Sequence, residues 1–290
     1  MGGNGNFCRA SGPLGLIYTG GLRTLLIRPG GIGDCILSFP AMEALAAGET
    51  EVWISGLVVS LVRFASRVRS ISSTGIDLLG LPDVEPPPQT IAALSCFDSI
   101  VSWYGTNRPE FRETVARLGL PFRFLDALPP NHTGMHAADF YLHQAGRAGA
   151  AVPRIACPRS RGDYAVIHPF SGSPRKNWPL HRFRELARQL KMPVRWCAGP
   201  EEELPEEELD DAVRFDDLYD LAKWLANARV YIGNDSGITH LAAAVGAPVV
   251  AVFGPTDPAV WGPRGECVHV ISKPGAWPEV DEVAARAIML

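Results

Sequence analysis

The stretch over residues 230–263, VYIGNDSGITHLAAAVGAPVVAVFGPTDPAVWGP, constrains the fold of this chain more than any other. Residues 230–232 are a short apolar run rich in β-branched side chains, and the residues from Gly233 to Gly237 interrupt it. This pattern predicts a buried strand, then a helix that stops at Gly246, then a second buried strand over residues 248–253. Strand, helix and strand in this order form one unit of a parallel sheet, and ligands bind at the carboxyl edge of such sheets.

The start of the predicted helix suits an anion. Ser236 can cap the helix, and Gly237 leaves room for a ligand beside the backbone. Free N–H groups of the first turn and the positive end of the helix dipole favour negative charge, so a phosphate fits there. His240, four residues after Ser236, is expected beside the same anion. The alternative is a βαβ unit in which Asp235 and Ser236 are caps and nothing binds.

Strands alternate with helices in both halves of the chain, which predicts two doubly wound domains of the α/β class facing each other across a cleft. Expected strands are residues 24–27, 52–55, 76–79, 100–103, 122–125, 164–168, 194–197 and 268–271. Expected helices are residues 57–68, 108–118, 136–147, 180–190, 218–228 and 280–290, and one that follows the first strand through Leu45 with Pro40 kinking it. Residues 86–88, three prolines, are expected to form a rigid surface loop.

Residues 153–162 carry two prolines, three arginines and no periodicity, which is typical of a linker between domains. We therefore expect a flexible tail over residues 1–22, a first domain over residues 23–155 and a second over residues 156–290. Both domains are expected to be Rossmann-like, but the first turn does not match the dinucleotide fingerprint, because Ile36 stands where a third glycine is required.

Charge and cysteine content limit the partners and the compartment. A net charge of −4 gives no general attraction for nucleic acid. Six scattered cysteines without a C-x-x-C pair indicate free thiols in a reducing compartment, so we expect a cytoplasmic protein. Residues 1–21 make a poor signal peptide, and no run of about 18 apolar residues predicts a membrane-spanning helix.

The residues NDSGITHLAAAVGAPVVAVFGPTDPAVWGPRG resemble the D-[ST]-G-x-x-H-x-A-A signature of glycosyltransferase family 9, the heptosyltransferases, through to its F-G-P-T-[DN]-P end. Three further blocks match in the same order: RPGGIGDCILSFPAMEAL, HPFSGSPRKNWPLHRFRELARQL and GPEEE. The resemblance covers nearly all of the second half and a short part of the first, and residues 52–158 carry no recognisable match. It implies the GT-B architecture, with the acceptor bound by the first domain and the nucleotide sugar by the second.

Asp34 follows the first predicted strand, and the resemblance places it on the catalytic base of the family. A helix N-cap after Gly33 explains the same residue without catalysis. The chain has Gly30 and Gly31 where the family usually has two small hydroxyl residues, which suggests a more mobile loop or a different acceptor contact at Gly31.

The loop over residues 168–178 is rich in small residues and hydrogen-bond donors and can wrap a diphosphate. Lys176 matches the phosphate-binding lysine of the family, whose charge would offset that of the leaving group, although an exposed surface lysine is the ordinary alternative. Ser171 and Ser173 are expected hydroxyl donors. Trp178 is interpreted as the apolar start of a helix rather than as a platform for a base.

Glu201 aligns with the family carboxylate that binds the nucleotide ribose, with a register uncertain by one residue among three adjacent glutamates. Arg63 and Arg67 form, with Arg69, a basic patch where the family binds an anionic acceptor, and a surface helix with snorkelling arginines explains them as well. His132, His136 and His143 lack a carboxylate at a helical partner spacing, so no metal site is predicted.

The sequence thus predicts an inverting glycosyltransferase that needs neither metal nor cofactor. It would move a heptose-like sugar from a nucleotide diphosphate, expected to be ADP-heptose, to a lipopolysaccharide-core-type or related acceptor, an anionic glycan or glycolipid. A monomer with peripheral contact to the inner membrane surface is expected. Two alternatives stay open: a nucleotide-binding GT-B module without transfer activity, and a sugar-nucleotide epimerase or hydrolase on the same fold.

Overall fold

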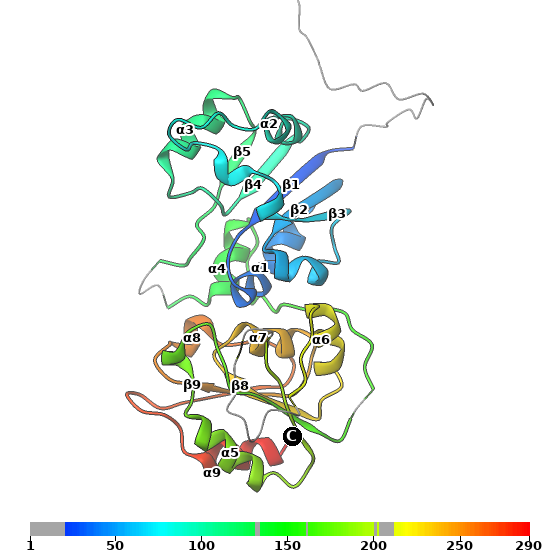
Figure 1. Ribbon diagram of the computed structural model, residues 1–290, viewed down its shortest axis with the longest axis vertical. Helices are drawn as coiled ribbons and strands as arrows, with labels where there is room; N and C mark the ends of the chain where they lie inside the picture. Colours follow the sequence, from blue (N-terminus) through cyan, green and yellow to red (C-terminus); the bar gives the residue numbers. More distant parts are fainter. Residues whose placement is uncertain (1–20, 131–133, 161, 200–201, 203–211) are drawn as a thin grey trace, which may run out of the picture.

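The computed structural model describes residues 21–130, 134–160, 162–199, 202 and 212–290, and most of the predicted tail, residues 1–20, lies outside them (Figure 1). The described chain contains two five-stranded sheets, in which every strand pair is parallel. Their strand orders are β3-β2-β1-β4-β5 and β10-β9-β8-β6-β7. Sequence periodicity therefore predicted the α/β class and the parallel arrangement correctly.

The first sheet is built around β1, which pairs with β2 on one side and with β4 on the other. Successive residues of β1 face opposite layers, since Leu25 packs under α2 and α3 while Leu26 packs under α1 and α4. The elements are β1 (Arg23–Arg28), α1 (Ile32–Leu45), β2 (Glu49–Ile54), β3 (Arg67–Ser70), α2 (Pro88–Leu94), β4 (Ser99–Ser102), α3 (Pro109–Arg117), β5 (Phe122–Phe124) and α4 (Ala137–Gln144).

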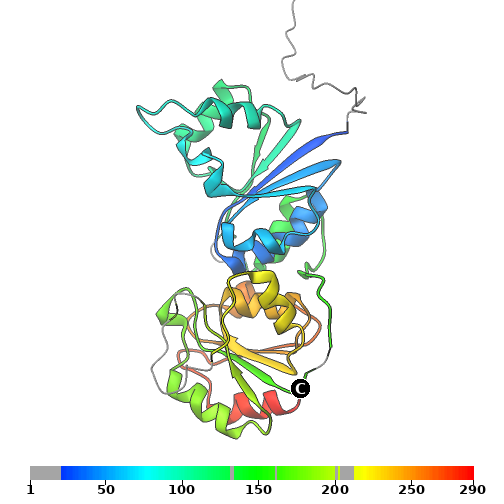
Figure 2. The ribbon, with the colours of Figure 1, turned by 45° about the vertical axis from the view of Figure 1, so that its right-hand side comes forward.

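The second sheet has β8 at its centre, paired with β6 and β9. Its α5 and α9 cover one face, and α6 and α7 cover the face that looks toward the first sheet (Figures 1 and 2). The elements are β6 (Ala165–His168), α5 (Leu180–Gln189), β7 (Val194–Trp196), α6 (Leu218–Leu225), β8 (Val230–Asn234), α7 (Gly237–Ala244), β9 (Val249–Phe253), α8 (Pro258–Trp261), β10 (Val268–Ser272) and α9 (Val280–Ile288).

Three predictions in the first half are wrong. The helix expected over residues 57–68 is a short 3₁₀ helix, Gly56–Leu61, followed by β3, because Val68 pairs with Val52 at the sheet edge. Arg63 and Arg67 consequently share no helix face. The strand expected over residues 76–79 is a 3₁₀ turn, Ile76–Leu78, which starts at Gly75. The proline run is not only a loop, since its last residue, Pro88, begins α2.

The two halves are joined by residues 145–160, which form no helix or strand in the structure. This segment contains most of the predicted linker, and the domain bounds at residue 155 remain a prediction. Ile155 donates its N–H to Ala244 O at 2.9 Å, so the segment is tied to the end of α7. A single apolar cluster runs from α1 and α4 of the first half into α6 and α7 of the second.

The N-termini of α1 and α7 pack closely, and the glycine that each contributes has no side chain to keep them apart. A Cβ atom on Gly237 would lie 2.6 Å from Cβ of Ile32 and 3.1 Å from the backbone nitrogen of Gly33. A Cβ atom on Gly33 would lie 2.9 Å from Cδ2 of His240. Gly237 was predicted to let a ligand approach the backbone, and in this structure a Cβ atom at Gly237 would meet the first turn of α1 rather than open space.

We expect Gly237→Ala to destabilise the protein by about 1–3 kcal/mol, because the added methyl group would overlap backbone and Cβ atoms of α1 that cannot move independently. Urea unfolding of the two proteins measures this difference. The control is Gly172→Ala, since a Cβ atom at Gly172 meets nothing within 4 Å and should leave the midpoint unchanged. Equal midpoints for Gly237→Ala and the wild type would contradict the close packing of α1 against α7.

Candidate active site

A cavity of about 860 Å³ lies between the two halves, where β1, β6 and β8 end and α1, the 168–178 loop and α7 begin. It brings together nine of the residues that the sequence singled out. These are Gly31, Asp34, Ser171, Ser173, Lys176, Asp235, Ser236, Gly237 and His240. Arg63 and Arg67 are not among its lining residues, and Glu201 lies outside the described residues.

Ser236 caps α7, as predicted. Its Oγ accepts a hydrogen bond from the N–H of Thr239 at 3.3 Å and lies 3.1 Å from the Thr239 hydroxyl. That hydroxyl in turn donates to the carbonyl of Asn234 at 2.5 Å, which fixes the turn between β8 and α7. The first N–H groups of α7 therefore border the cavity in a fixed orientation, as an anion requires.

Asp235 holds a lysine and a threonine side chain beside that turn. Its Oδ2 accepts hydrogen bonds from Nζ of Lys176 at 3.1 Å and from the hydroxyl of Thr256 at 2.8 Å. The Lys176 side chain is 27% exposed, so it is not the freely solvated lysine of the alternative interpretation. An ammonium group has three donors, and the contact with Asp235 uses one, which leaves two for a ligand in the cavity.

His240 is buried beside the same carboxylate, with Nε2 4.0 Å from Oδ1 of Asp235. Its Nδ1 is buried and has no hydrogen-bond partner. Burial lowers the pKa of His240 to about 4, against the opposing attraction of Asp235. The imidazole is therefore neutral at pH 7, and it presents an unsatisfied nitrogen in a residue that lines the cavity.

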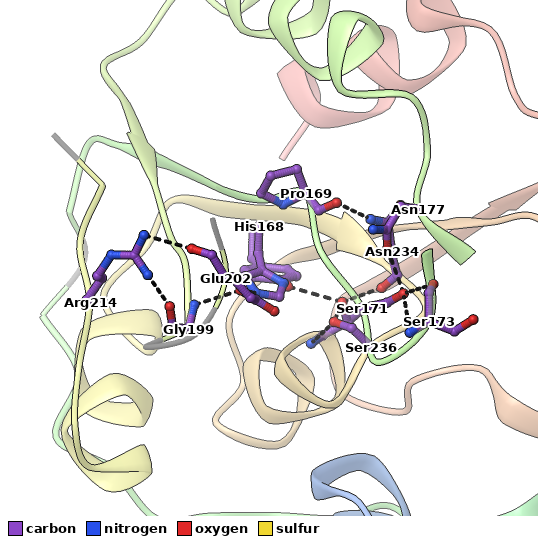
Figure 3. A network of polar contacts seen from close by, with 12 residues as sticks. His168, Pro169, Ser171, Ser173, Asn177, Gly199, Glu202, Arg214, Asn234 and Ser236 are labelled. Carbon is purple, nitrogen blue, oxygen red and sulfur yellow. Dashed lines mark hydrogen bonds and ion pairs between the residues drawn. The ribbon is translucent and has the colours of Figure 1, made fainter. Parts of the chain in front are cut away.

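The 168–178 loop is held in place by Asn234, a buried residue that the sequence analysis did not single out. Its Oδ1 accepts from the N–H of Trp178 and its Nδ2 donates to the carbonyl of Pro169, both at 2.8 Å (Figure 3). Within the loop the Ser171 hydroxyl lies 2.7 Å from the Ser173 carbonyl oxygen and 2.6 Å from Oδ1 of Asn177, and its one proton can be donated to either. Asn234 therefore ties both ends of the loop to β8, and Ser171 braces the loop from within.

Trp178 belongs to the apolar core rather than to the ligand site. Its side chain is buried and meets the ring of Phe183, the first-turn aromatic of α5, edge to face at 4.9 Å. Its Nε1 donates to the carbonyl of Pro278 at 3.2 Å. Trp178 is thus a core residue and does not line the cavity, but it precedes α5, which begins at Leu180, rather than starting that helix.

Glu202 is the described glutamate at the cavity. Its Oε2 accepts from the N–H of Gly199 at 2.6 Å and lies 3.1 Å from Nε2 of His168 (Figure 3). Although burial opposes ionisation, these two hydrogen bonds hold the pKa of Glu202 below its usual value. Glu202 is within the one-residue uncertainty of the predicted ribose-binding glutamate. For His168, the sequence indicated only a position at the end of a predicted strand.

Asp34 is the third residue of α1 and not its N-cap, which corrects the cap interpretation. The helix begins at Ile32 because Gly31 supplies the cap, and Oδ2 of Asp34 accepts the N–H of Gly31 at 3.2 Å. Among the described residues no partner is recorded for Oδ1. The carboxylate thus stands at the cavity with one oxygen committed to the turn and one available.

The remaining predicted residues have other contacts. Arg63 places its guanidinium over the ring of Tyr219 in α6 at 4.8 Å, and Arg67 is an exposed residue at the start of β3. His136 bonds the carbonyl of Gly262 through Nε2 at 2.8 Å, and His132 lies outside the described residues. Across the part of the chain that is described, no group of three His, Cys, Asp or Glu residues could hold a metal ion. No helix in that part is long and apolar enough to cross a membrane.

The lowered pKa of His240 predicts acid sensitivity. Between about pH 6.5 and 4 the unfolded chain binds a proton at this histidine and the folded chain does not, so the free energy of unfolding falls as the pH falls. His240→Asn should remove this pH dependence, which amounts to at most about 3 kcal/mol in the free energy of unfolding. Urea unfolding at pH 7.5, 6 and 5 measures it, with exposed His181→Asn as the control. Identical slopes in His240→Asn and the wild type would show that His240 does not titrate in this way.

Comparisons with known proteins agree on one family. The model of glycosyltransferase family 9 (heptosyltransferase) matches residues 135–286. Lipopolysaccharide heptosyltransferase 1 of Escherichia coli O18:K1:H7 is 31% identical over 141 residues, 45% of this chain and 43% of that protein. The enzyme of the same name from Pseudomonas aeruginosa PAO1 is 34% identical over 193 residues, 57% of this chain and 52% of that protein. The alignments thus span about half the length of these relatives.

Solved structures show the same fold. E. coli heptosyltransferase WaaC with ADP superposes with a TM-score of 0.65 at 18% identity, covering 91% of this chain and 98% of that one. The family 9 glycosyltransferase from Veillonella parvula gives 0.69 at 18% identity, covering 92% and 96%. The two facing sheets are therefore the GT-B architecture that the resemblance implied. With the family match extending over more than half of its length, this chain belongs to glycosyltransferase family 9, the heptosyltransferases.

Proposed function

We propose that the protein is an inverting, metal-independent heptosyltransferase that uses ADP-heptose as donor and a glycan of the lipopolysaccharide-core type, or a related one, as acceptor. One observation carries the proposal: a single cavity holds Asp34 of the first half together with Lys176, His240 and the start of α7 from the second. One protein of the same fold, E. coli heptosyltransferase WaaC, has been solved with ADP and with ADP-2-deoxy-2-fluoro heptose, which supports the choice of donor.

The second half offers the groups that a diphosphate needs. The first residues of α7, Lys176 and His240 all line the cavity, and they carry free backbone N–H groups, an ammonium group and an unsatisfied imidazole nitrogen. Donors fixed in advance toward the place where charge develops stabilise a transition state strongly. These groups would receive the negative charge of the departing ADP without a metal ion.

The ribose would be held by a carboxylate beside this diphosphate site. The assignment of this role to Glu201 stays a prediction, and Glu202 is the neighbour that the structure describes at the cavity. Its Oε2 is already occupied by Gly199 and His168, so Oε1 would accept from the ribose hydroxyls.

Asp34 would act as the general base. Its carboxylate takes the proton of the acceptor hydroxyl while the acceptor oxygen forms a bond to the anomeric carbon. The bond from that carbon to the diphosphate oxygen breaks, and its electron pair leaves with ADP. One displacement of this kind inverts the anomeric configuration and needs no protein nucleophile.

The charge of the acceptor, the oligomeric state and the cellular location of the protein remain proposals. An anionic acceptor was expected from the family resemblance, with Arg63 and Arg67 as the candidate residues for binding it. Both lie outside the cavity lining, so their role in acceptor binding has no support from the geometry. We propose a monomer that works in the cytoplasm, with peripheral contact to the inner membrane surface. A binding module without transfer, or an epimerase or hydrolase, would show no transfer of the sugar to an acceptor.

We expect ADP to stabilise the protein and ADP-heptose to be turned over with release of ADP in the presence of EDTA. ADP at a hundred times its dissociation constant should add about 2.7 kcal/mol to the free energy of unfolding. Lys176→Ala should weaken this stabilisation, because it removes the ammonium group that faces the diphosphate. A thermal-shift titration and an ADP-release assay with added glycan acceptors measure the two effects.

Lys191→Ala, a change at an exposed lysine, is the matched control and should bind ADP like the wild type. A lack of thermal shift with millimolar ADP would contradict the nucleotide site. Turnover that stops in EDTA and returns with Mg²⁺ would contradict the metal-independent mechanism.

A further inference from the structure

Arg28 is a buried arginine beside the cavity to which the proposed reaction gives no role. It is the last residue of β1, and it is 1% exposed. Its guanidinium lies over the ring of Tyr141 at 4.7 Å and over the ring of Trp103 at 5.9 Å. All the recorded contacts of its guanidinium are with neutral groups, although a charge in the interior is costly unless it is paired.

The guanidinium spans the turn that carries Asp34. Its Nη1 donates to the carbonyl of Pro29 at 3.0 Å, and its Nη2 donates to the carbonyl of Asp34 at 3.2 Å. These two carbonyls mark the two ends of the turn between β1 and the first residues of α1. The planar fork of an arginine is suited to such a two-point contact, and a lysine ammonium is not.

The turn itself has little rigidity of its own. Gly30 has φ of +126°, a conformation that side chains disfavour, and the next residue, Gly31, caps α1 without any side chain. Two recorded side chains of α1 contact the turn. Oδ2 of Asp34, the carboxylate that must react, accepts the Gly31 N–H, and the Cys35 thiol, a weak donor, lies 3.7 Å from the Gly30 carbonyl and 3.9 Å from the Arg28 carbonyl. Neither is a strong contact that is independent of the reacting group, and the charged fork of Arg28 is placed to supply one.

We propose that Arg28 is a positioning residue: its buried fork fixes the diglycine turn, so that the Asp34 carboxylate stands opposite the start of α7. The inference rests on the proposed role of Asp34 as base. It assigns to Arg28 no contact with substrate. α4 closes over the guanidinium through Tyr141, whose hydroxyl bonds the carbonyl of Ala127 at 3.0 Å, and so keeps the fork away from water.

The test compares three variants of the full chain. Arg28→Met keeps an unbranched stem and removes the fork, and Arg28→Lys keeps the charge and removes the fork. Arg23→Met is the matched control, because Arg23 begins the same strand, donates to the carbonyl of Cys96 at 3.0 Å and lies over the ring of Phe97 at 5.3 Å, away from Asp34. Each protein is measured by hydrogen exchange of residues 30–35, by ADP binding, and by kcat and KM for the donor.

We expect Arg28→Met and Arg28→Lys both to speed hydrogen exchange in residues 30–35 by about fivefold or more, the factor that corresponds to one lost hydrogen bond. The kcat should fall by about a hundredfold, as displacement of a reacting group by about 1 Å can do, while ADP affinity and donor KM stay within about twofold. Arg23→Met should change none of these quantities.

Unchanged exchange and unchanged kcat in Arg28→Met would overturn the proposal, and so would full recovery of both in Arg28→Lys, which would show that the charge alone matters. A loss of ADP binding equal to the loss of kcat would also overturn it, since it would indicate general unfolding. If Arg28→Met does not fold, hydrogen exchange of residues 30–35 and kcat in Arg28→Lys decide whether the proposal holds. Absence of turnover in the wild type would count against the proposed function, and hydrogen exchange would still decide whether Arg28 holds the turn.

Discussion

The contact between the N-termini of α1 and α7 is the constraint on which the rest of the structure depends. Two helices from different sheets can approach this closely only where the contact has room for few side chains, and Gly33 and Gly237 contribute none to it. The contact brings the first turn of α1, with Asp34, to the first turn of α7, with Ser236. The cavity, its lining from both halves and the proposed division of labour all follow from this one close approach.

Unsatisfied polar atoms gather around this contact. Of the four buried side-chain nitrogen and oxygen atoms without a partner in the described residues, two are imidazole nitrogens of cavity-lining residues, His168 and His240, and a third is Nε of Arg28 beside the Asp34 turn. Buried polar groups are normally paired, so such a concentration beside one cavity is typical of a ligand-binding site. Burial keeps His240 neutral because the attraction of Asp235 offsets it only in part. A negatively charged ligand in the cavity would add to that attraction and so favour the protonated imidazole.

The sequence predicted the second half better than the first, for a physical reason. Strands β8 and β9 are buried on both faces and α7 lies between Ser236 and Gly246, so periodicity and punctuation there agree. Between Gly56 and Ser70 a short 3₁₀ helix precedes an edge strand whose identity depends on pairing with β2, and local pattern alone favours a helix. Tertiary pairing overrides local preference in such segments.

The site divides in the same way. Residues inside the motifs, such as Ser236 and Lys176, could be found from spacing and resemblance. Contacts between residues distant in sequence could not: the Lys176 ammonium is fixed by Asp235, 59 residues away, and the 168–178 loop is fixed by Asn234. Arg28 opens one of the matched blocks, yet its proposed role could not be predicted there, because that role depends on burial and on contacts with two backbone carbonyls.

Asp34→Asn tests most directly whether the two halves divide the reaction between them. Asparagine keeps the size of the side chain and an oxygen for the Gly31 N–H, but it cannot take a proton from the acceptor. On one preparation, read against wild type and against Glu43→Gln on the same helix, ADP affinity and the unfolding midpoint should stay unchanged. Donor turnover should fall by about a hundredfold to ten-thousandfold. Turnover preserved with a stability loss of about 1 kcal/mol would show instead that Asp34 only supports the helix start.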